Sequence, residues 1–153
     1  MTDAAKPKLI GINHVALEVG DIDAALAFYG TFFDFTLRGR SDTQAFIDLG
    51  DQFLALNKMD EIQRDAERHF GLVVDDREGL RQRLAAAGVE IVTEQRLDFL
   101  DPWGNRVEIV PYVDIQFLKD RAVLAQMGAD ALRKTDAARE ELAGKGITPP
   151  EDA

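Results

Sequence analysis

The sequence repeats one order of predicted elements, and this internal duplication limits most strongly how the chain can fold. A shift of 55 residues places His14 on His69, and a shift of 53 places residues 46–48 (Phe-Ile-Asp) on residues 99–101 (Phe-Leu-Asp). Each match is short, but together they agree with a strand, a helix and three further strands that are predicted twice. We therefore expect two similar modules within one α+β domain.

The first copy is expected at residues 9–57. Residues 9–19 alternate and are rich in branched side chains, which is typical of a strand. Asp21 follows in the place of an N-cap, and apolar side chains then recur at helical spacing, so a helix is predicted over 22–33. Three further strands are predicted at residues 36–40, 44–49 and 52–57.

The second copy is expected at residues 68–112, after a polar connector. A strand at 68–74 leads to Asp76, which can cap a helix that ends at Gly88. Residues 101–105 (Asp-Pro-Trp-Gly-Asn) have the composition of a turn. Three further strands are predicted at residues 89–92, 96–100 and 106–112.

Residues 113–153 lie outside the duplication and are predicted to form a C-terminal helical extension. Apolar residues favour a helix within 117–127, and a mostly polar second helix is expected over 130–143. We expect this extension to pack over a sheet edge or a partner subunit.

The composition excludes several classes of function. The chain has no cysteine, so disulfide scaffolds, thiolate zinc sites and cysteine nucleophiles are ruled out. It has 28 acidic and 18 basic residues, and this balance argues against binding to nucleic acid or to an anionic membrane surface. The sequence shows neither a secretory signal nor an apolar run near the ~20 residues of a membrane span. We expect a cytoplasmic protein.

Two histidines and one glutamate are candidate metal ligands. His14 and His69 are the only histidines, and both fall at the same register of the duplicated first strand. Alternation along a strand places small residues, Ala16 and Gly71, on the histidine faces. It also turns Glu108 away from its apolar neighbours. Two imidazoles and a carboxylate are typical ligands of a divalent ion. Each residue alone is more often an ordinary strand residue, and it is the repeated register of the histidines that favours a metal site.

Motifs throughout the duplicated region carry a resemblance to a known family. They are residues 12–17 (INHVAL), 27–29 (AFY), 46–50 (FIDLG), 68–70 (RHF) and 99–108 (FLDPWGNRVE). The last motif is similar to an Asp-Pro-x-Gly-Asn-x-x-Glu signature. With these motifs the chain resembles the vicinal oxygen chelate superfamily over residues 9–112. That superfamily includes glyoxalase I, fosfomycin-resistance thiol transferases, extradiol dioxygenases and bleomycin-resistance proteins.

The resemblance implies two βαβββ modules that form a curved mixed sheet around a central cavity. It implies that His14, His69 and Glu108 bind a divalent metal ion, with iron, manganese, nickel and zinc all open. Ala55 stands at the register of a fourth ligand in glyoxalase I-like members and cannot coordinate a metal, so a site with three protein ligands is expected. The residues expected to line the cavity are Ala16, Glu18, Ala55, Gly71 and Tyr112.

The sequence departs in two places from the fosfomycin-resistance group. The segment 93–95 is shorter than that group's cation-binding loop, and Ala16 replaces a small hydroxyl residue. The first hypothesis is therefore broad: a metal-dependent enzyme acts on a small organic substrate that chelates the metal through two oxygens. Lyase, isomerase, oxygenase and epoxide-opening chemistry all fit it. The alternative is a non-catalytic protein that sequesters a ligand, as bleomycin-resistance proteins do. A homodimer is expected in either case.

Overall fold

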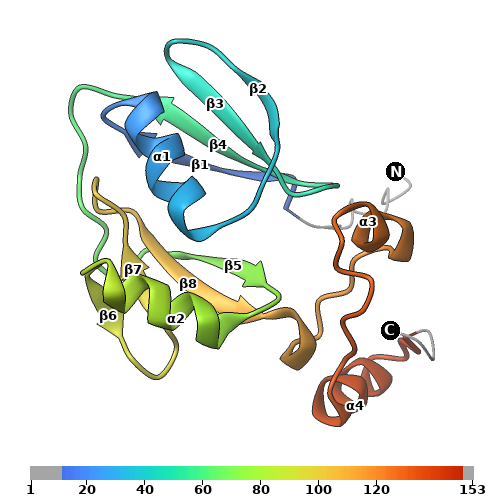
Figure 1. Cartoon of the computed structure of the whole chain (residues 1–153). Coiled ribbons are helices and arrows are strands. Elements are labelled where there is room, and N and C mark those ends of the chain that lie inside the picture. The colour runs from blue at the N-terminus through green and yellow to red at the C-terminus, as the bar shows by residue number, and fades with distance from the viewer. Residues whose placement is uncertain (1–11, 150–153) are drawn as a thin grey trace, which may run out of the picture.

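The computed structural model describes residues 12–149, which form two mixed sheets with one helix each and a helical extension (Figure 1). The first sheet has the strand order β1-β4-β3-β2, with β1 and β4 parallel and the other pairs antiparallel. We call this unit, residues 14–58, module one. Its elements are β1 (His14–Val19), α1 (Ile22–Phe32), β2 (Leu37–Arg40), β3 (Gln44–Asp48) and β4 (Phe53–Lys58).

The second sheet, with its helix, forms module two, residues 70–111. Its strand order is β5-β8-β7-β6, again with one parallel pair, β5 and β8, followed by antiparallel pairs. The matching order and directions confirm the predicted duplication. Its elements are β5 (Phe70–Val74), α2 (Arg77–Ala86), β6 (Ile91–Thr93), β7 (Asp98–Leu100) and β8 (Arg106–Pro111).

The two modules form separate sheets within the described residues, whereas the family resemblance implies one curved sheet. β1 pairs only with β4 and β5 only with β8 in this part of the chain, so both are edge strands. Edge strands present unpaired backbone donors and acceptors, which natural proteins usually cover. Residues 9–11 of the first predicted strand lie outside the described residues.

Both helices begin at the predicted aspartates. The Asp21 carboxylate accepts a hydrogen bond from the Ala24 amide at 2.8 Å, and the Asp76 carboxylate accepts one from the Gly79 amide at 2.9 Å. Each carboxylate accepts a hydrogen bond from an amide that has no partner within its helix. Its negative charge also interacts favourably with the positive end of the helix dipole. The second helix stops just before Gly88, whose φ of +67° suits a residue without a side chain.

Helix α1 joins the hydrophobic cores of the two modules. Phe28, Phe33 and Phe70 pack against buried residues of both modules. Phe28 and Phe33 also lie against Phe99 of β7, with ring centroids 6.3 and 6.5 Å apart. The two sheets are therefore held together by shared apolar contacts rather than by strand pairing.

A buried polar cluster at the turn between β7 and β8 adds a second link between the modules. Asp101 accepts a hydrogen bond from the Tyr29 hydroxyl at 2.9 Å, and the Asn105 amide donates to the Glu18 carbonyl at 2.8 Å. Burial, together with the nearby Asp101 charge, raises the pKa of Tyr29, and burial raises the pKa of Asp101. Trp103 is partly buried and packs against module one.

The C-terminal extension contacts module one at the β3–β4 turn. It contains α3 (Arg121–Gln126), capped by Asp120, and α4 (Asp136–Gly144), both shorter than predicted. Lys119 donates to the Leu49 carbonyl at 2.8 Å and pairs with Asp51. The extension was expected over a sheet edge or a partner subunit, but this contact lies at the turn between the two inner strands, β3 and β4. No helix in residues 12–149 is long and apolar enough to cross a membrane.

Candidate metal centre

The structure brings His69 and Glu108 together. His69 directly precedes β5, and Gly71 of that strand pairs with Glu108 in the β5–β8 register. The His69 Nε2 atom lies 3.2 Å from Oε2 of Glu108, and both side chains are partly exposed. Val107 and Ile109 point into the core, at 0% and 1% exposure, so alternation along β8 turns Glu108 to the open face.

A second contact of the His69 ring shows which of its two nitrogens carries a proton. Nδ1 of His69 lies 2.8 Å from the Glu67 carbonyl oxygen, which can only accept, so Nδ1 carries the proton. In the neutral ring, Nε2 then turns a lone pair toward the carboxylate of Glu108. Two acceptors at this distance attract each other only through a shared proton or a cation between them. Metal-binding histidines usually donate their other ring N–H to such a backbone carbonyl or to a carboxylate.

The separation of the two acceptors fits two ligands on one ion. Metal–ligand distances of about 2.1 Å place adjacent ligands about 3.0 Å apart at an octahedral angle and about 3.4 Å apart at a tetrahedral angle. The 3.2 Å between His69 and Glu108 lies within this range. The donor types and their spacing therefore suit a divalent ion.

His14 does not join this pair within one chain. Its ring stacks on Phe53 with centroids 4.7 Å apart, and its Nδ1 lies 3.0 Å from the Asn13 side-chain oxygen. The Asn13 oxygen accepts from Nδ1, and Nε2 makes no hydrogen bond within residues 12–149. No group of three histidine, aspartate or glutamate side chains within residues 12–149 is placed to hold one metal ion. The described chain thus presents one pair of candidate ligands and one separate histidine.

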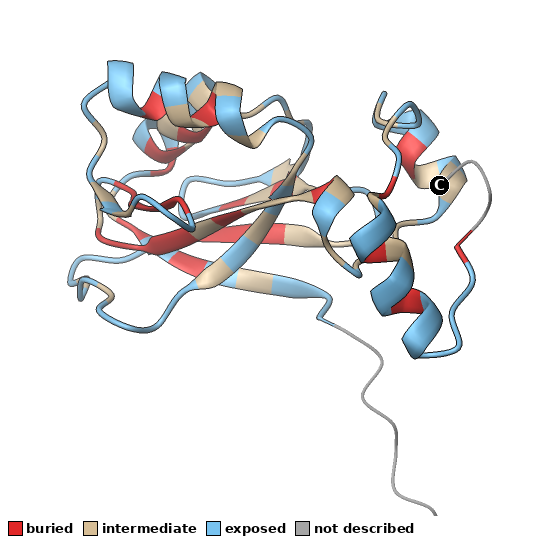
Figure 2. Cartoon of the chain, turned by 90° about the horizontal axis from the view of Figure 1, so that it is seen from below, coloured by how far each residue is buried: buried red, intermediate tan, exposed pale blue. Residues whose placement is uncertain are grey.

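The strand faces that carry the candidate ligands are open. Leu17 and Val19 of β1 are buried, whereas His14, Ala16 and Glu18 are exposed. Figure 2 shows this alternation of buried and exposed residues along the strands. The exposed positions on this face lie along the edge strands β1 and β5, whereas Ala55 of β4 and Asp98 of β7, on the same faces, are buried.

The other residues expected to line the cavity lie in different environments. Ala16 pairs with Ala55 in the β1–β4 register, as Gly71 pairs with Glu108 in module two. The structure therefore places Ala55 at the position equivalent to Glu108. Tyr112 lies elsewhere, because the chain leaves β8 at Pro111 and turns into a 3-10 helix (Tyr112–Asp114).

Tyr112 is buried by the C-terminal extension instead of lining an open face. It is 4% exposed, and its ring lies edge-on to Phe117, with centroids 6.2 Å apart. The Lys134 amine lies 3.4 Å from the ring centroid and donates to the Tyr112 and Ile115 carbonyls. Tyr112 is therefore part of the packing that anchors the extension.

The structure shows a buried ion pair beside Glu108 that was not predicted from the sequence. Asp98 lies opposite Glu108 across β7 and β8 and accepts hydrogen bonds from Arg106 at 2.6 and 2.9 Å. Both residues are buried, and Arg106 also donates to the Ala66 carbonyl at 2.6 Å. This contact ties the connector that precedes His69 to β8. The opposite charges stand in adjacent predicted strands, but only their pairing register reveals the contact.

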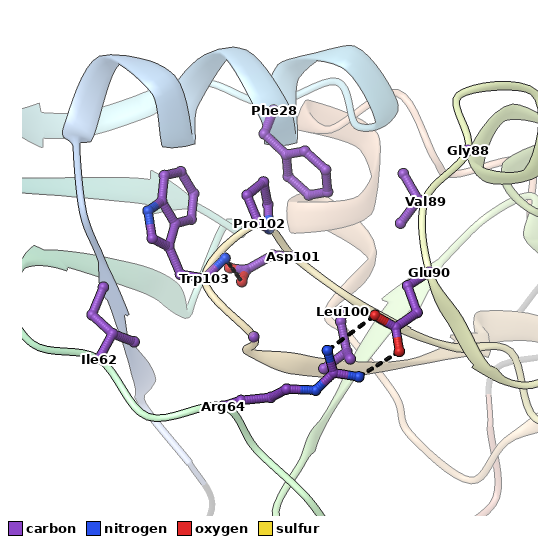
Figure 3. Close-up of a pocket in the computed structure, with 11 residues that line it drawn as sticks. Phe28, Ile62, Arg64, Gly88, Val89, Glu90, Leu100, Asp101, Pro102 and Trp103 are labelled. Carbon is purple, nitrogen blue, oxygen red and sulfur yellow. Dashed lines mark hydrogen bonds and ion pairs between the residues drawn. The ribbon is translucent and has the colours of Figure 1, made fainter.

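A cavity of about 520 Å³ lies away from the candidate ligands. It is bounded by α1, the connector and the turn between β7 and β8 (Figure 3). Phe28, Ile62 and Trp103 form apolar walls, and the Arg64–Glu90 ion pair crosses its rim. None of the three candidate ligands lines it.

Comparisons with known proteins agree with this architecture. The glutathione transferase FosA of Serratia marcescens is 32% identical over 114 residues, which are 66% of this chain and 80% of that protein. The structure of lactoylglutathione lyase from Agrobacterium tumefaciens is 25% identical and covers 70% of this chain and 96% of its own, with a TM-score of 0.55. The fosfomycin resistance protein FosX from Listeria monocytogenes, at 19% identity, shares the fold over 68% of this chain and 94% of its own, with a TM-score of 0.58.

The sequence profile of the Glyoxalase/Bleomycin resistance protein/Dioxygenase superfamily matches residues 11–109. This match spans both modules and all three candidate ligands. The chain therefore belongs to that superfamily.

Proposed function

We propose that this protein is a metal-dependent enzyme that acts on a small, oxygen-bearing organic substrate. The observation that carries the proposal is the approach of His69 Nε2 to the Glu108 carboxylate at 3.2 Å, with Nδ1 of the same ring held by the Glu67 carbonyl. The relatives named as transferases and lyases support an enzymatic role. We favour it over ligand sequestration because the superfamily's ligand positions are retained.

We further propose that His14 reaches the centre from a second copy of the chain. His14 and the His69–Glu108 pair lie on exposed strand faces, and β1 and β5 are edge strands within the described chain. A second copy related by two-fold symmetry would cover these edges and complete two equivalent centres. The expected homodimer thereby becomes a requirement of the site.

Each residue then has a separate role. His14 and His69 supply neutral nitrogen ligands, and Glu108 supplies one negative charge. A divalent ion held by these three groups keeps positive charge and open positions, with which it can polarise two adjacent substrate oxygens. Ala16 and Gly71 leave space beside the imidazoles, and Arg106 holds the segment that carries His69.

A mixed dimer tests both parts of the proposal. His14→Ala and His69→Ala chains, with different affinity tags, are produced together, and dimers that carry both tags are isolated. In such a dimer one centre loses both histidines, while the other receives His14 from one chain and the His69–Glu108 pair from its partner. We expect about one metal ion per mixed dimer by elemental analysis.

The two single-variant dimers serve as matched controls and should hold no stoichiometric metal. A mixed dimer without metal, beside a wild-type protein that holds metal, would place all the ligands within one chain. Wild-type protein that holds no divalent metal would reject the metal centre altogether.

A further inference from the structure

An arginine lies across the face of module one that carries His14. The Arg38 guanidinium carbon is 4.7 Å from the centroid of the Phe53 ring, which is also 4.7 Å from the His14 ring centroid. Arg38 therefore lies at most twice this distance from the imidazole. Phe46 meets Phe53 edge-on, with centroids 5.8 Å apart, and widens the aromatic floor between them.

The Arg38 charge has no carboxylate partner in the described part of the chain. Arg40, two residues along the same strand, is paired with Asp23 at 2.7 Å. The contact with Phe53 restricts the guanidinium and leaves its N–H donors available.

The acidic residues on this face are directed elsewhere. The Asp48 carboxylate accepts a hydrogen bond from the Gly50 amide at 2.7 Å. Glu18 lies toward the other end of β1, opposite Asn57, whereas His14 lies opposite Phe53. The end of the face near His14 and Phe53 combines an apolar aromatic surface with the Arg38 guanidinium and with the Asp48 carboxylate, which lies opposite Phe53 in the β3–β4 register.

We propose that Arg38 binds an anionic group of the substrate, and that the substrate class is a small organic anion whose metal-binding oxygens and negative group are separated by a short apolar segment. This inference deepens the proposed function and rests on it. The apolar segment would lie beside Phe46 and the edge of Phe53, the oxygens would reach the centre at His14, and the anionic group would accept hydrogen bonds from Arg38.

Two hydroxamates that differ in charge test this inference on the cobalt-loaded dimer. Acetohydroxamate is neutral away from its chelating oxygens, and the monohydroxamate of succinic acid adds a carboxylate. We follow binding of each by visible absorption of the cobalt ion. The carboxylate should tighten binding about fivefold at low ionic strength, and added salt should reduce this advantage.

The comparison of two arginine variants assigns the effect to one side chain. Arg38→Met keeps the stem over Phe53 and removes the charge, so it should abolish the preference for the charged hydroxamate. Arg40→Met removes an equal charge from the same strand and should retain the preference. Equal binding of both hydroxamates to wild type, or a preference that survives in Arg38→Met, would overturn the role of Arg38.

A nuclear magnetic resonance titration separates this inference from the metal centre. The Nε–H resonance of Arg38 is identified by its loss in Arg38→Met and is followed as each hydroxamate is added. If neither hydroxamate alters the cobalt spectrum, the proposed metal centre fails. A shift caused only by the charged hydroxamate would still support Arg38 as an anion-binding residue, and no shift would reject it.

Discussion

Tyr29→Phe should destabilise the fold by removing the hydroxyl that links the two modules. Tyr29 is 1% exposed, and its hydroxyl donates to Asp101 at 2.9 Å. A buried hydrogen bond to a charged group contributes about 1.5–3 kcal/mol. Asp101 keeps hydrogen bonds from the Asn105 side chain and from two backbone amides, so the lower end of the range applies. We expect a loss of about 1.5 kcal/mol in the free energy of unfolding, or about 3–6 °C in Tm.

Urea unfolding at neutral pH measures this loss, and Tyr112→Phe is the matched control. Tyr112 is also buried, but its hydroxyl makes no hydrogen bond within the described residues. The control should therefore lose less than about 0.5 kcal/mol. Equal losses in the two variants would show that the Tyr29–Asp101 hydrogen bond contributes nothing specific.

The same hydrogen bond predicts how the stability difference between wild type and Tyr29→Phe changes with pH. The Tyr29 hydroxyl stabilises the ionised Asp101 and so opposes the rise that burial causes in its pKa. Tyr29→Phe should raise the pKa of Asp101 further. A carboxyl whose pKa is raised on folding contributes stability as pH falls through that pKa, because the folded state then binds the extra proton. The difference between wild type and variant should therefore shrink from neutral pH toward pH about 4. A difference that grows on acidification would refute the assignment.

Two further substitutions test how the C-terminal extension is held. Gly50→Ala should lower the free energy of unfolding in urea by about 1 kcal/mol more than Gly88→Ala does. Both glycines have a positive φ, but only at residue 50 would a new Cβ crowd the extension, at 2.5 Å from Val123. Equal losses of stability in the two variants would mean that α3 does not pack closely against the β3–β4 turn. Burial lowers the pKa of Lys134 to about 8 from the usual 10.5, so the unfolded state binds more protons between these values and wild-type stability should rise with pH across that window. Lys134→Met should remove this rise of Tm with pH. If Tm rises equally in wild type and variant, Lys134 does not cause the rise.

Much of the fold could be predicted because its causes are local. Asp21, Asp76 and Gly88 act within one helical turn of their own positions, so the spacing of apolar residues and caps was sufficient to place both helices. Alternation along β8 likewise predicted that Glu108 leaves the core. Apart from the start of the first strand, which was predicted at residue 9 and lies at His14, strand ends differed by one or two residues, where side-chain packing rather than local pattern decides the last backbone hydrogen bonds.

The parts that could not be predicted depend on contacts between distant segments. Periodicity places His14 and His69 on strand faces, but it does not say whether two faces meet. That depends on how Phe28 and Phe33 pack between the modules. Tyr112 continued the alternation of β8 in the sequence, yet the chain turns at Pro111 and buries it under Lys134. The amine and the ring are 22 residues apart, beyond the reach of a local pattern.

The two copies of the duplicated unit use the same kind of turn to bind different segments. The turn after β7 is buried against α1 through Asp101 and Asn105. The turn after β3 holds α3 through Lys119 and an Asp51 side chain that is half exposed. Segments with few buried contacts open locally at small free energy, whereas buried junctions open only when the whole domain unfolds. We therefore expect the extension to detach from the turn after β3 at a smaller free energy than is needed to open the turn after β7, so that it can open locally while the paired modules stay folded.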